Sequence, residues 1–489
     1  MELNTENREK VWLRYAIVAF ALILFIFLRS QLESGNALHT QQTEESMSSM
    51  YYGDLQIKLY FYTQYALEKG VTFSGTKKSG QMLPLAFDFY QKAAKGPSPA
   101  AIRRAGVMSY ELHREGAVEY FDKLVAPATL KGLQPEDVRK LRGEAAMWRD
   151  VYAGKLTANK ADEYAKRINI LNLGPARAFA LEHLFSRVNQ FDRARQVISA
   201  GKERAAVSFM ATGGLFLAII LAGLAGVVFI ILFAMNGRKW IEHPAEEPED
   251  RTPIAKVLFT GFIAYLLSSI ALGLIAGISL SSTLEKMPSD SRVFYIVILE
   301  FGLIVATGLI GLGVVYHLLK QQGRKLDVIG LTTRKFLMNI LWGVAGYCAL
   351  LPLLLVAGLV WNILSRIFFR GVETPVNEVV PLFLSGNTAV IFVVILLGSV
   401  LAPFFEEIFF RGMLYNALRV RMSIAGALVL ASAAFAIIHP FPGGFLPIFA
   451  IASVFNLLFE TRRSLVPSMV AHAIHNSVIF LFIYLLLIT

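Results

Sequence analysis

The sequence predicts an all-α, polytopic membrane helical bundle of about nine spans, with a helical domain inserted between the first two spans. The first observation is composition: 55% of the 489 residues are hydrophobic and only 17% are charged, whereas soluble domains carry roughly 25% charged residues. The second is a series of apolar runs long enough to cross a bilayer, and the third is a long polar stretch with helical periodicity between two of them. A single soluble globule and a disordered chain are both excluded, because disorder needs low hydrophobicity and high charge.

A helix needs about 20 apolar residues to span the hydrocarbon core. Nine runs approach this length, and two of them, residues 424–438 and 445–458, are short enough to be tilted or partly re-entrant. The nine are Val11–Leu28, Val207–Met235, Val257–Ile278, Phe294–Leu319, Phe336–Trp361, Thr388–Tyr415, Ile424–Ile438, Phe445–Leu458 and Val466–Leu487.

The first run has the features of either a membrane anchor or a signal peptide, since basic residues precede a short apolar segment. No small-x-small cleavage site follows it directly, and Arg29 comes immediately after it. We therefore expect residues 1–29 to be an uncleaved N-terminal anchor, with a cleaved signal peptide as the alternative.

Residues 30–205 form a different kind of sequence, which is charged, rich in tyrosine and without an apolar run of spanning length. Its apolar residues recur at helical spacing. Two stretches, Ala101–Leu124 and Pro175–Ile198, each predict a helix, a short polar turn and a second helix. The second stretch resembles one hairpin of a tetratricopeptide-type array, but two weak copies are too few to predict a solenoid. An irregular helical domain is the favoured interpretation.

Charged loops predict the orientation of the bundle. With the N-terminus inside, every inner loop is basic, as the positive-inside rule requires. These inner basic residues are Arg8, Lys10, Arg14, Arg238, Lys239, Arg324, Lys325, Arg334, Lys335, Arg419, Arg421, Arg462 and Arg463. The chain is then a multi-pass protein of the cell membrane with a cytoplasmic N-terminus and an extracytoplasmic domain at residues 30–205. Much of the formal net charge, 47 − 36 = +11, is thus explained by topology, and no nucleic-acid partner is expected.

Ionisable groups inside a span are costly and indicate function by default. Glu300 and His317 lie near the ends of one span and are expected to be interfacial. The last four spans differ, because three of them each place polar groups at depth. These residues are Glu406, Glu407, Arg411, His439, His472 and Asn476.

The turn between the sixth and seventh spans brings two of these residues to one level. Glu406 precedes Met422 by sixteen residues and His439 follows it by seventeen, so we expect the two side chains to face each other. His472 lies only nine residues beyond Arg463 and reaches the same level only if the hairpin extends past the inner end of the bundle.

The helical period predicts which side chains share a face. His472 and Asn476 are four residues apart, and so are Glu407 and Arg411, so each pair lies on one face. Arg411 can therefore neutralise Glu407 and leave Glu406 pointing elsewhere. Pro403 lacks an N–H and is expected to bend the helix just before the two acidic residues.

This set of groups suits the hydrolysis of a carbonyl compound, most simply a peptide bond. A carboxylate beside a histidine in apolar surroundings can act as a general base on water. A second histidine with an asparagine one turn away supplies donors for a developing oxyanion. The competing interpretation is a set of buried ion pairs that stabilise the bundle, which we favour for Glu407 and Arg411 alone.

These motifs resemble those of the CPBP intramembrane proteases, the family of CAAX prenyl endopeptidases and bacteriocin-processing (Abi) enzymes. The family's three motifs are Glu-Glu-x-x-x-Arg, Phe-x-x-x-His and His-x-x-x-Asn. They occur here as Glu406-Glu407…Arg411, Phe435…His439 and His472…Asn476. The resemblance begins near Thr388 and covers a catalytic transmembrane core at 388–489. It does not cover the helices of 206–387 or the domain of 30–205.

The resemblance implies roles for these residues. Glu406 would be the catalytic glutamate that activates water with His439, and His472 and Asn476 would form the oxyanion site. Glu407, Arg411 and Phe435 would support the site structurally, and His475 would be a bystander.

The resemblance leaves metal dependence open, because the family has also been labelled metalloprotease. Glu406, His439 and His472 can in principle form a three-ligand zinc site with an open position. The metal-free, glutamate-dependent version is favoured, with no cofactor. The only cysteine, Cys348, excludes an intramolecular disulfide and a cysteine-based metal site.

The sequence thus predicts an intramembrane endopeptidase whose partners are a membrane-associated protein or peptide substrate and the lipid bilayer. The domain at 30–205 is expected to bind a protein partner. The alternative is a non-catalytic membrane scaffold that uses this outer domain. A transporter with a proton relay is least favoured, because the polar groups gather in one place instead of following a pathway.

Overall fold

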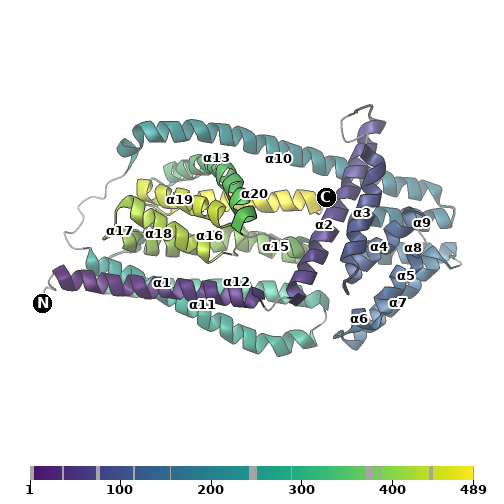
Figure 1. The fold of residues 1–489 in the computed structure, drawn as a ribbon, viewed down its shortest axis with the longest axis horizontal. Coiled ribbons are helices and arrows are strands. Elements are labelled where there is room, and N and C mark those ends of the chain that lie inside the picture. Colours follow the sequence, from purple (N-terminus) through teal and green to yellow (C-terminus); the bar gives the residue numbers. More distant parts are fainter. Residues whose placement is uncertain are drawn as a thin grey trace.

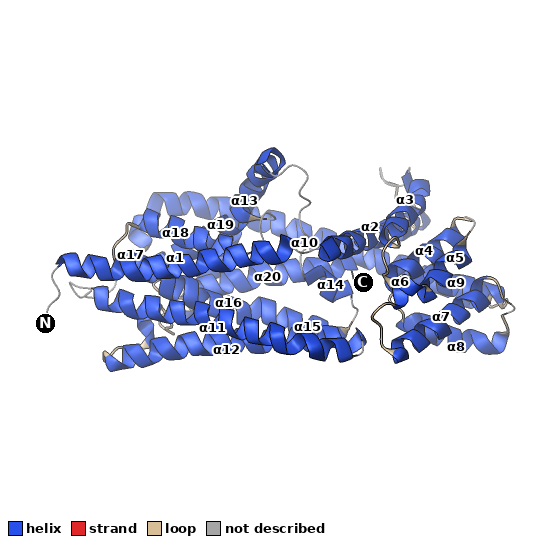
Figure 2. Cartoon of the chain, turned by 60° about the horizontal axis from the view of Figure 1, so that its bottom comes forward, coloured by secondary structure: helices blue, strands red, loops and turns tan. Residues whose placement is uncertain are grey.

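A computed structural model describes the placement of residues 5–35, 38–72, 78–113, 116–154, 156–241, 251–287, 289–368, 379–384, 387–439 and 444–487. Every regular element in these ranges is a helix. One end of the molecule is a bundle of long apolar helices, and the other is a domain of shorter helices (Figures 1 and 2). The predicted all-α bundle with an inserted helical domain is confirmed.

Eight described helices are long and apolar enough to cross a membrane. The seventh predicted span corresponds to the apolar but shorter α18 (Ile424–Ile437), whose 14 residues fall below the length of a span. The bundle consists of α1 (Thr5–Gly35), α10 (Phe191–Trp240), α11 (Thr252–Lys286), α12 (Ser289–Gln321), α13 (Phe336–Phe368), α15 (Thr388–Leu396), α16 (Ala402–Glu407), α17 (Asn416–Arg419), α18, α19 (Phe445–Arg462) and α20 (Val466–Leu487), with α14 (Val379–Leu384) near the outer domain.

The N-terminus lies at the end of the bundle remote from the outer domain (Figure 1). Successive long helices run back and forth between this end and the domain of shorter helices (Figure 1). The side chains of Arg8 and Arg238 lie outside the described part of the chain. The bundle therefore belongs to a multi-pass membrane protein.

The domain of shorter helices, called the outer domain, is helical where the apolar residues recur at helical spacing. It contains α2 (Leu38–Glu68), α3 (Ser79–Ala93), α4 (Pro99–Glu111), α5 (Ala117–Asp122), α6 (Pro127–Leu130), α7 (Pro135–Tyr152), α8 (Ala158–Ile170), α9 (Arg177–Arg187) and the first turns of α10. The stretch 101–124 holds most of α4 and all of α5, and the stretch 175–198 holds α9 and the first turns of α10. The 50-residue helix α10 runs without interruption from this domain into the bundle, across the predicted boundary at residue 205.

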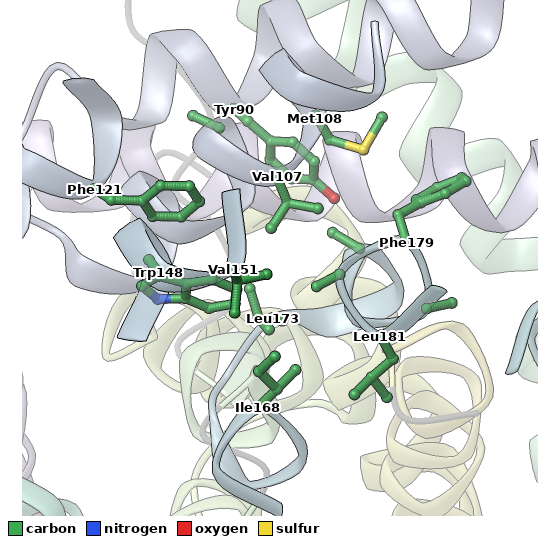
Figure 3. Packing of buried hydrophobic residues seen from close by; sticks show 14 of the residues in the cluster. Tyr90, Val107, Met108, Phe121, Trp148, Val151, Ile168, Leu173, Phe179 and Leu181 are labelled. Carbon is green, nitrogen blue, oxygen red and sulfur yellow. The ribbon is translucent and has the colours of Figure 1, made fainter. Parts of the chain in front are cut away.

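Large aromatic side chains fill the core of the outer domain. Trp148, Phe121 and Tyr90 are fully buried, and the rings of Phe121 and Trp148 stack with their centroids 4.9 Å apart. Figure 3 shows these residues converging with aliphatic side chains from several helices. Ser98 begins α4 by accepting a hydrogen bond from the Ala101 N–H, and Pro99 occupies the position where a missing N–H costs nothing.

A buried ion pair crosses this core. The Arg104 guanidinium donates to both carboxylate oxygens of Asp54, with Nε–Oδ1 at 2.9 Å and Nη2–Oδ2 at 3.0 Å. The Tyr90 hydroxyl donates to the same Oδ1, and Arg104 also reaches the Asn172 carbonyl at 2.8 Å. The pair connects α2, α3, α4 and the segment before α9, and removing one partner would leave a buried charge without compensation.

We predict that Arg104→Met lowers the free energy of unfolding of the outer domain by about 3–5 kcal/mol, because Asp54 loses its cationic partner. Pulse proteolysis of the full-length protein in detergent, across a urea series, measures this loss. The control is Arg195→Met, which removes an exposed pair with Asp192 and should cost less than about 1 kcal/mol. Equal stability of the two variants would show that the buried pair is not needed.

Candidate active site

The helix that carries the two adjacent glutamates is wound in two different ways. The α-helical segment α16 lies between two π-helical segments, η5 (Leu397–Leu401) and η6 (Ile408–Tyr415). At the end of η5 the Ala402 N–H donates to the Leu397 carbonyl, five residues earlier. Pro403, which follows, has no N–H to donate. The carbonyl of Gly398 therefore receives neither backbone donor that would normally reach it.

Asn476 of α20 uses this carbonyl. Its side-chain nitrogen Nδ2 donates to the Gly398 oxygen at 2.7 Å. Pro403, predicted to bend the helix, thus produces a wide turn that gives the asparagine a fixed partner. An amide nitrogen has two hydrogens, so one N–H of Asn476 is left to point elsewhere.

α20 packs antiparallel to the helix that carries Glu406 and Glu407. Contacts at three positions along the two helices show which residues lie at the same depth. A Cβ on Gly412 would lie against Leu465 at 3.5 Å, just before α20 begins. His472 lies beside the two glutamates, and Asn476 lies beside Gly398. Because Gly412 is level with Leu465, the residues from Met413 to Arg419 extend beyond the start of α20. This extension is the condition under which His472 was predicted to reach the depth of the glutamates.

A hydrogen bond of α20 to the loop before α13 fixes where α20 starts. The Leu465 N–H donates to the Gly330 carbonyl at 2.9 Å. Gly330 has a left-handed conformation (φ 80°), and a Cβ there would lie 2.6 Å from the ring of Phe459. Only glycine meets both requirements without strain.

Glu407 is the centre of a sealed polar cluster. Its Oε1 accepts from Arg411 Nη1 at 3.1 Å and from His472 Nδ1 at 2.9 Å. Glu407 and Arg411 have no exposed side-chain surface, and His472 is 7% exposed. A carboxylate only accepts hydrogen bonds, so His472 carries a proton on Nδ1 and its ring orientation is fixed.

Two aromatic rings enclose the guanidinium of this cluster. Arg411 lies over the rings of Phe435 and Phe455, with its central carbon 4.5 Å and 5.2 Å from their centroids. Phe455 also packs against His472, with ring centroids 5.1 Å apart. These contacts explain how a charged pair is accommodated among apolar side chains.

Glu406 has the opposite environment. Its side chain is 26% exposed, and its Oε2 lies 3.8 Å from His472 Nε2. This distance is too long for a direct hydrogen bond. The two neighbouring carboxylates thus differ: Glu407 is sealed and paired, whereas Glu406 is partly accessible.

His439 lies at the end of α18, beside the same aromatic ring. Its Nδ1 is 2.7 Å from the carbonyl of Phe435, and its ring centroid is 4.5 Å from that of Phe435. Because a carbonyl only accepts, Nδ1 carries the proton, and Nε2 of the neutral ring is an acceptor. Within the described residues the structure gives Glu406 a contact with His472 and none with His439.

In the described part of the chain, no three side chains of His, Cys, Asp or Glu lie close enough together to hold a metal ion. The candidate zinc ligands Glu406, His439 and His472 are therefore not gathered into a three-residue ligand group in this structure.

Residues 388–478 match the family model of the type II CAAX prenyl endopeptidase Rce1-like proteins. This part of the chain is similar to CAAX-type proteases. The matched segment begins with α15 and ends two residues after Asn476, so it contains every candidate site residue and none of the outer domain. No match was found among curated proteins or among solved structures.

One neighbour of the site lies outside the matched segment and was missed by sequence reasoning. Tyr265 of α11 stacks on Phe409, with centroids 3.8 Å apart, and its hydroxyl interacts electrostatically with Glu406. A tyrosine in an apolar span gives no signal of its own, because its proximity to Glu406 arises only when α11 packs against η6. Phe455 of α19 was missed for the same reason.

We predict that the two glutamates respond differently to the same isosteric change. Glu407→Gln should lower the free energy of unfolding by about 3–5 kcal/mol, because Arg411 then remains buried without a counter-charge. Glu406→Gln, at a partly exposed position, should change it by less than about 1 kcal/mol. Unfolding in mixed micelles, followed by tryptophan fluorescence, measures both. Equal losses would contradict the division into a sealed and an accessible carboxylate.

Proposed function

We propose that this chain is an intramembrane endopeptidase that hydrolyses a peptide bond of a membrane-associated protein or peptide. The observation that carries the proposal is the environment of Glu406: it is the accessible member of the polar cluster, and it lies beside a histidine whose orientation is fixed. A purely structural cluster would be sealed throughout, as Glu407 and Arg411 are. The family match over the same residues supports the reaction class.

Water activation is assigned to Glu406 and His439. Glu406 takes a proton from the attacking water as general base, which typically accelerates such a step by about 10²–10⁴-fold. The Nε2 of His439 is an acceptor because its Nδ1–H is committed to the Phe435 carbonyl, so it can orient the same water once substrate is bound. The water oxygen attacks the scissile carbonyl carbon, and Glu406 then delivers the proton to the leaving amine as the C–N bond breaks.

Stabilisation of the oxyanion is assigned to His472 and Asn476. The Nδ1–H of His472 is held by Glu407, so Nε2, which faces Glu406, is the ring nitrogen assigned to donate to the oxyanion. Asn476 offers the N–H that Gly398 does not use. Donors fixed before the reaction cost no reorganisation when charge develops on the carbonyl oxygen.

We predict that Glu406→Gln and His439→Ala each reduce cleavage by about 10²-fold or more, since each removes a group that acts on the water. The first substrate to assay is a farnesylated peptide ending in a CAAX sequence, because the matched family is described as CAAX prenyl endopeptidases. Glu300→Gln, which neutralises a carboxylate on α12, is the control and should retain full activity. Native-level cleavage by either folded site variant would overturn the assignment.

A separate prediction concerns the metal. If the glutamate mechanism operates alone, incubation of the purified protein with a tight zinc chelator leaves the cleavage rate unchanged. Loss of activity on chelation, restored by added Zn²⁺, would instead require Glu406, His439 and His472 to rearrange into a ligand set.

A further inference from the structure

The helix that carries His472 and Asn476 is held along its whole length, and its far end is held by the outer domain. At its start, the Leu465 N–H is bound to Gly330. In the middle, His472 and Asn476 are bound to Glu407 and to the Gly398 carbonyl. The other end of α20 leaves the bundle and meets α2 and α10, so the C-terminus lies beside α2 in Figure 1.

Two side chains bind the last turn of α20. Lys58 of α2 donates from Nζ to the Leu486 carbonyl at 2.8 Å, and the Ser208 hydroxyl of α10 donates to the Leu485 carbonyl. The last four carbonyls of a helix lack donors within the helix. A cation at this end also interacts favourably with the helix dipole. These two bonds are therefore a side-chain cap supplied by a different part of the chain.

Lys58 is an unusual choice for this contact, because it is only 5% exposed. Burying an ammonium group is costly unless it is paired. The charged side chains that act on it are Asp54, one turn earlier on α2, and Arg204 on α10. Asp54 is already engaged by Arg104 and Tyr90, so the core of the outer domain and the cap of α20 share one network.

The cap is far from the chemistry and acts along the helix. Leu486 lies 14 residues beyond His472 and 10 beyond Asn476, which corresponds to about 21 Å and 15 Å at 1.5 Å per residue. A helix transmits displacement of one end to the other because it is stiff along its axis. Misplacement of catalytic groups by about 1 Å can cost up to about 10²-fold in rate.

We propose that Lys58 is a positioning residue, through which the outer domain fixes the axial position of α20 and hence of His472 and Asn476. The proposal rests on the protease function proposed above. It assigns the outer domain a direct role in catalysis, independent of any partner it binds.

Kinetics of three variants test it. Lys58→Met should lower kcat by about 10-fold or more with little change in KM, because substrate binding is untouched while the oxyanion donors shift. Lys58→Arg keeps a cationic donor and should recover most of kcat. The control Lys202→Met removes the pair of α10 with Glu68 of α2, which does not touch α20, and should leave kcat unchanged. Equal effects of Lys58→Met and Lys202→Met would overturn the proposal.

The pH profile adds a readout that a structural role would not move. Burial, reinforced by Arg204 and opposed by Asp54, lowers the pKa of Lys58 from 10.5 to about 8. Between these values the folded protein holds fewer protons on this lysine than the unfolded chain, so this group makes the free energy of unfolding rise with pH. A decline of kcat above about pH 8 in the wild type, absent in Lys58→Arg, is expected and cannot come from unfolding at Lys58.

Hydrogen exchange tests the cap without relying on activity. In Lys58→Met, peptides that cover residues 480–487 should exchange faster than in the wild type, since the last turn of α20 loses a donor. This change is expected in the Glu406→Gln background as well, so failure of the protease assignment and failure of the cap are distinguishable. Unchanged exchange would show that Lys58 does not hold α20, and faster exchange with unchanged kcat would show that the cap does not position the site.

Discussion

The buried carboxylate of Glu407 is the constraint on which the rest of the site depends. An unpaired carboxylate in apolar surroundings would cost many kcal/mol, so it requires the Arg411 guanidinium one turn away. That guanidinium in turn needs the rings of Phe435 and Phe455. The same carboxylate holds His472. One buried charge thus fixes side chains from four helices, and it leaves Glu406 as the accessible neighbour.

The backbone of the helix that carries Glu407 also helps to fix the candidate site. The wide turn before Pro403 frees the Gly398 carbonyl, and this carbonyl fixes Asn476. Such π-helical turns frequently mark functional sites. α20 receives its position from three sources: the Gly330 loop, the buried cluster and the outer domain. This convergence explains how a domain outside the bundle can affect groups deep within it.

Much of the fold could be predicted from the sequence, because apolar runs and helical spacing are local signals. The candidate site residues also carry a signal in the sequence, since polar groups in apolar spans are rare. The contacts that these residues make were harder to predict. The rule of equal distance from a turn paired Glu406 with His439, but it assumes regular helices, whereas the π-helical segments and the Phe435 carbonyl change which groups meet. Tyr265, Phe455 and Lys58 carry no local signal and are placed by tertiary packing alone.

A double-mutant cycle tests the central claim, that the buried Glu407–Arg411 pair organises the site. Glu407→Gln, Arg411→Met and the double variant would be unfolded in mixed micelles beside the wild type. Because each single change leaves a buried group unpaired and the double change does not, the account predicts a coupling energy of about 2 kcal/mol or more, within the range found for residues in one network. Additive losses would contradict it, since they would mean that the two residues stabilise the bundle independently.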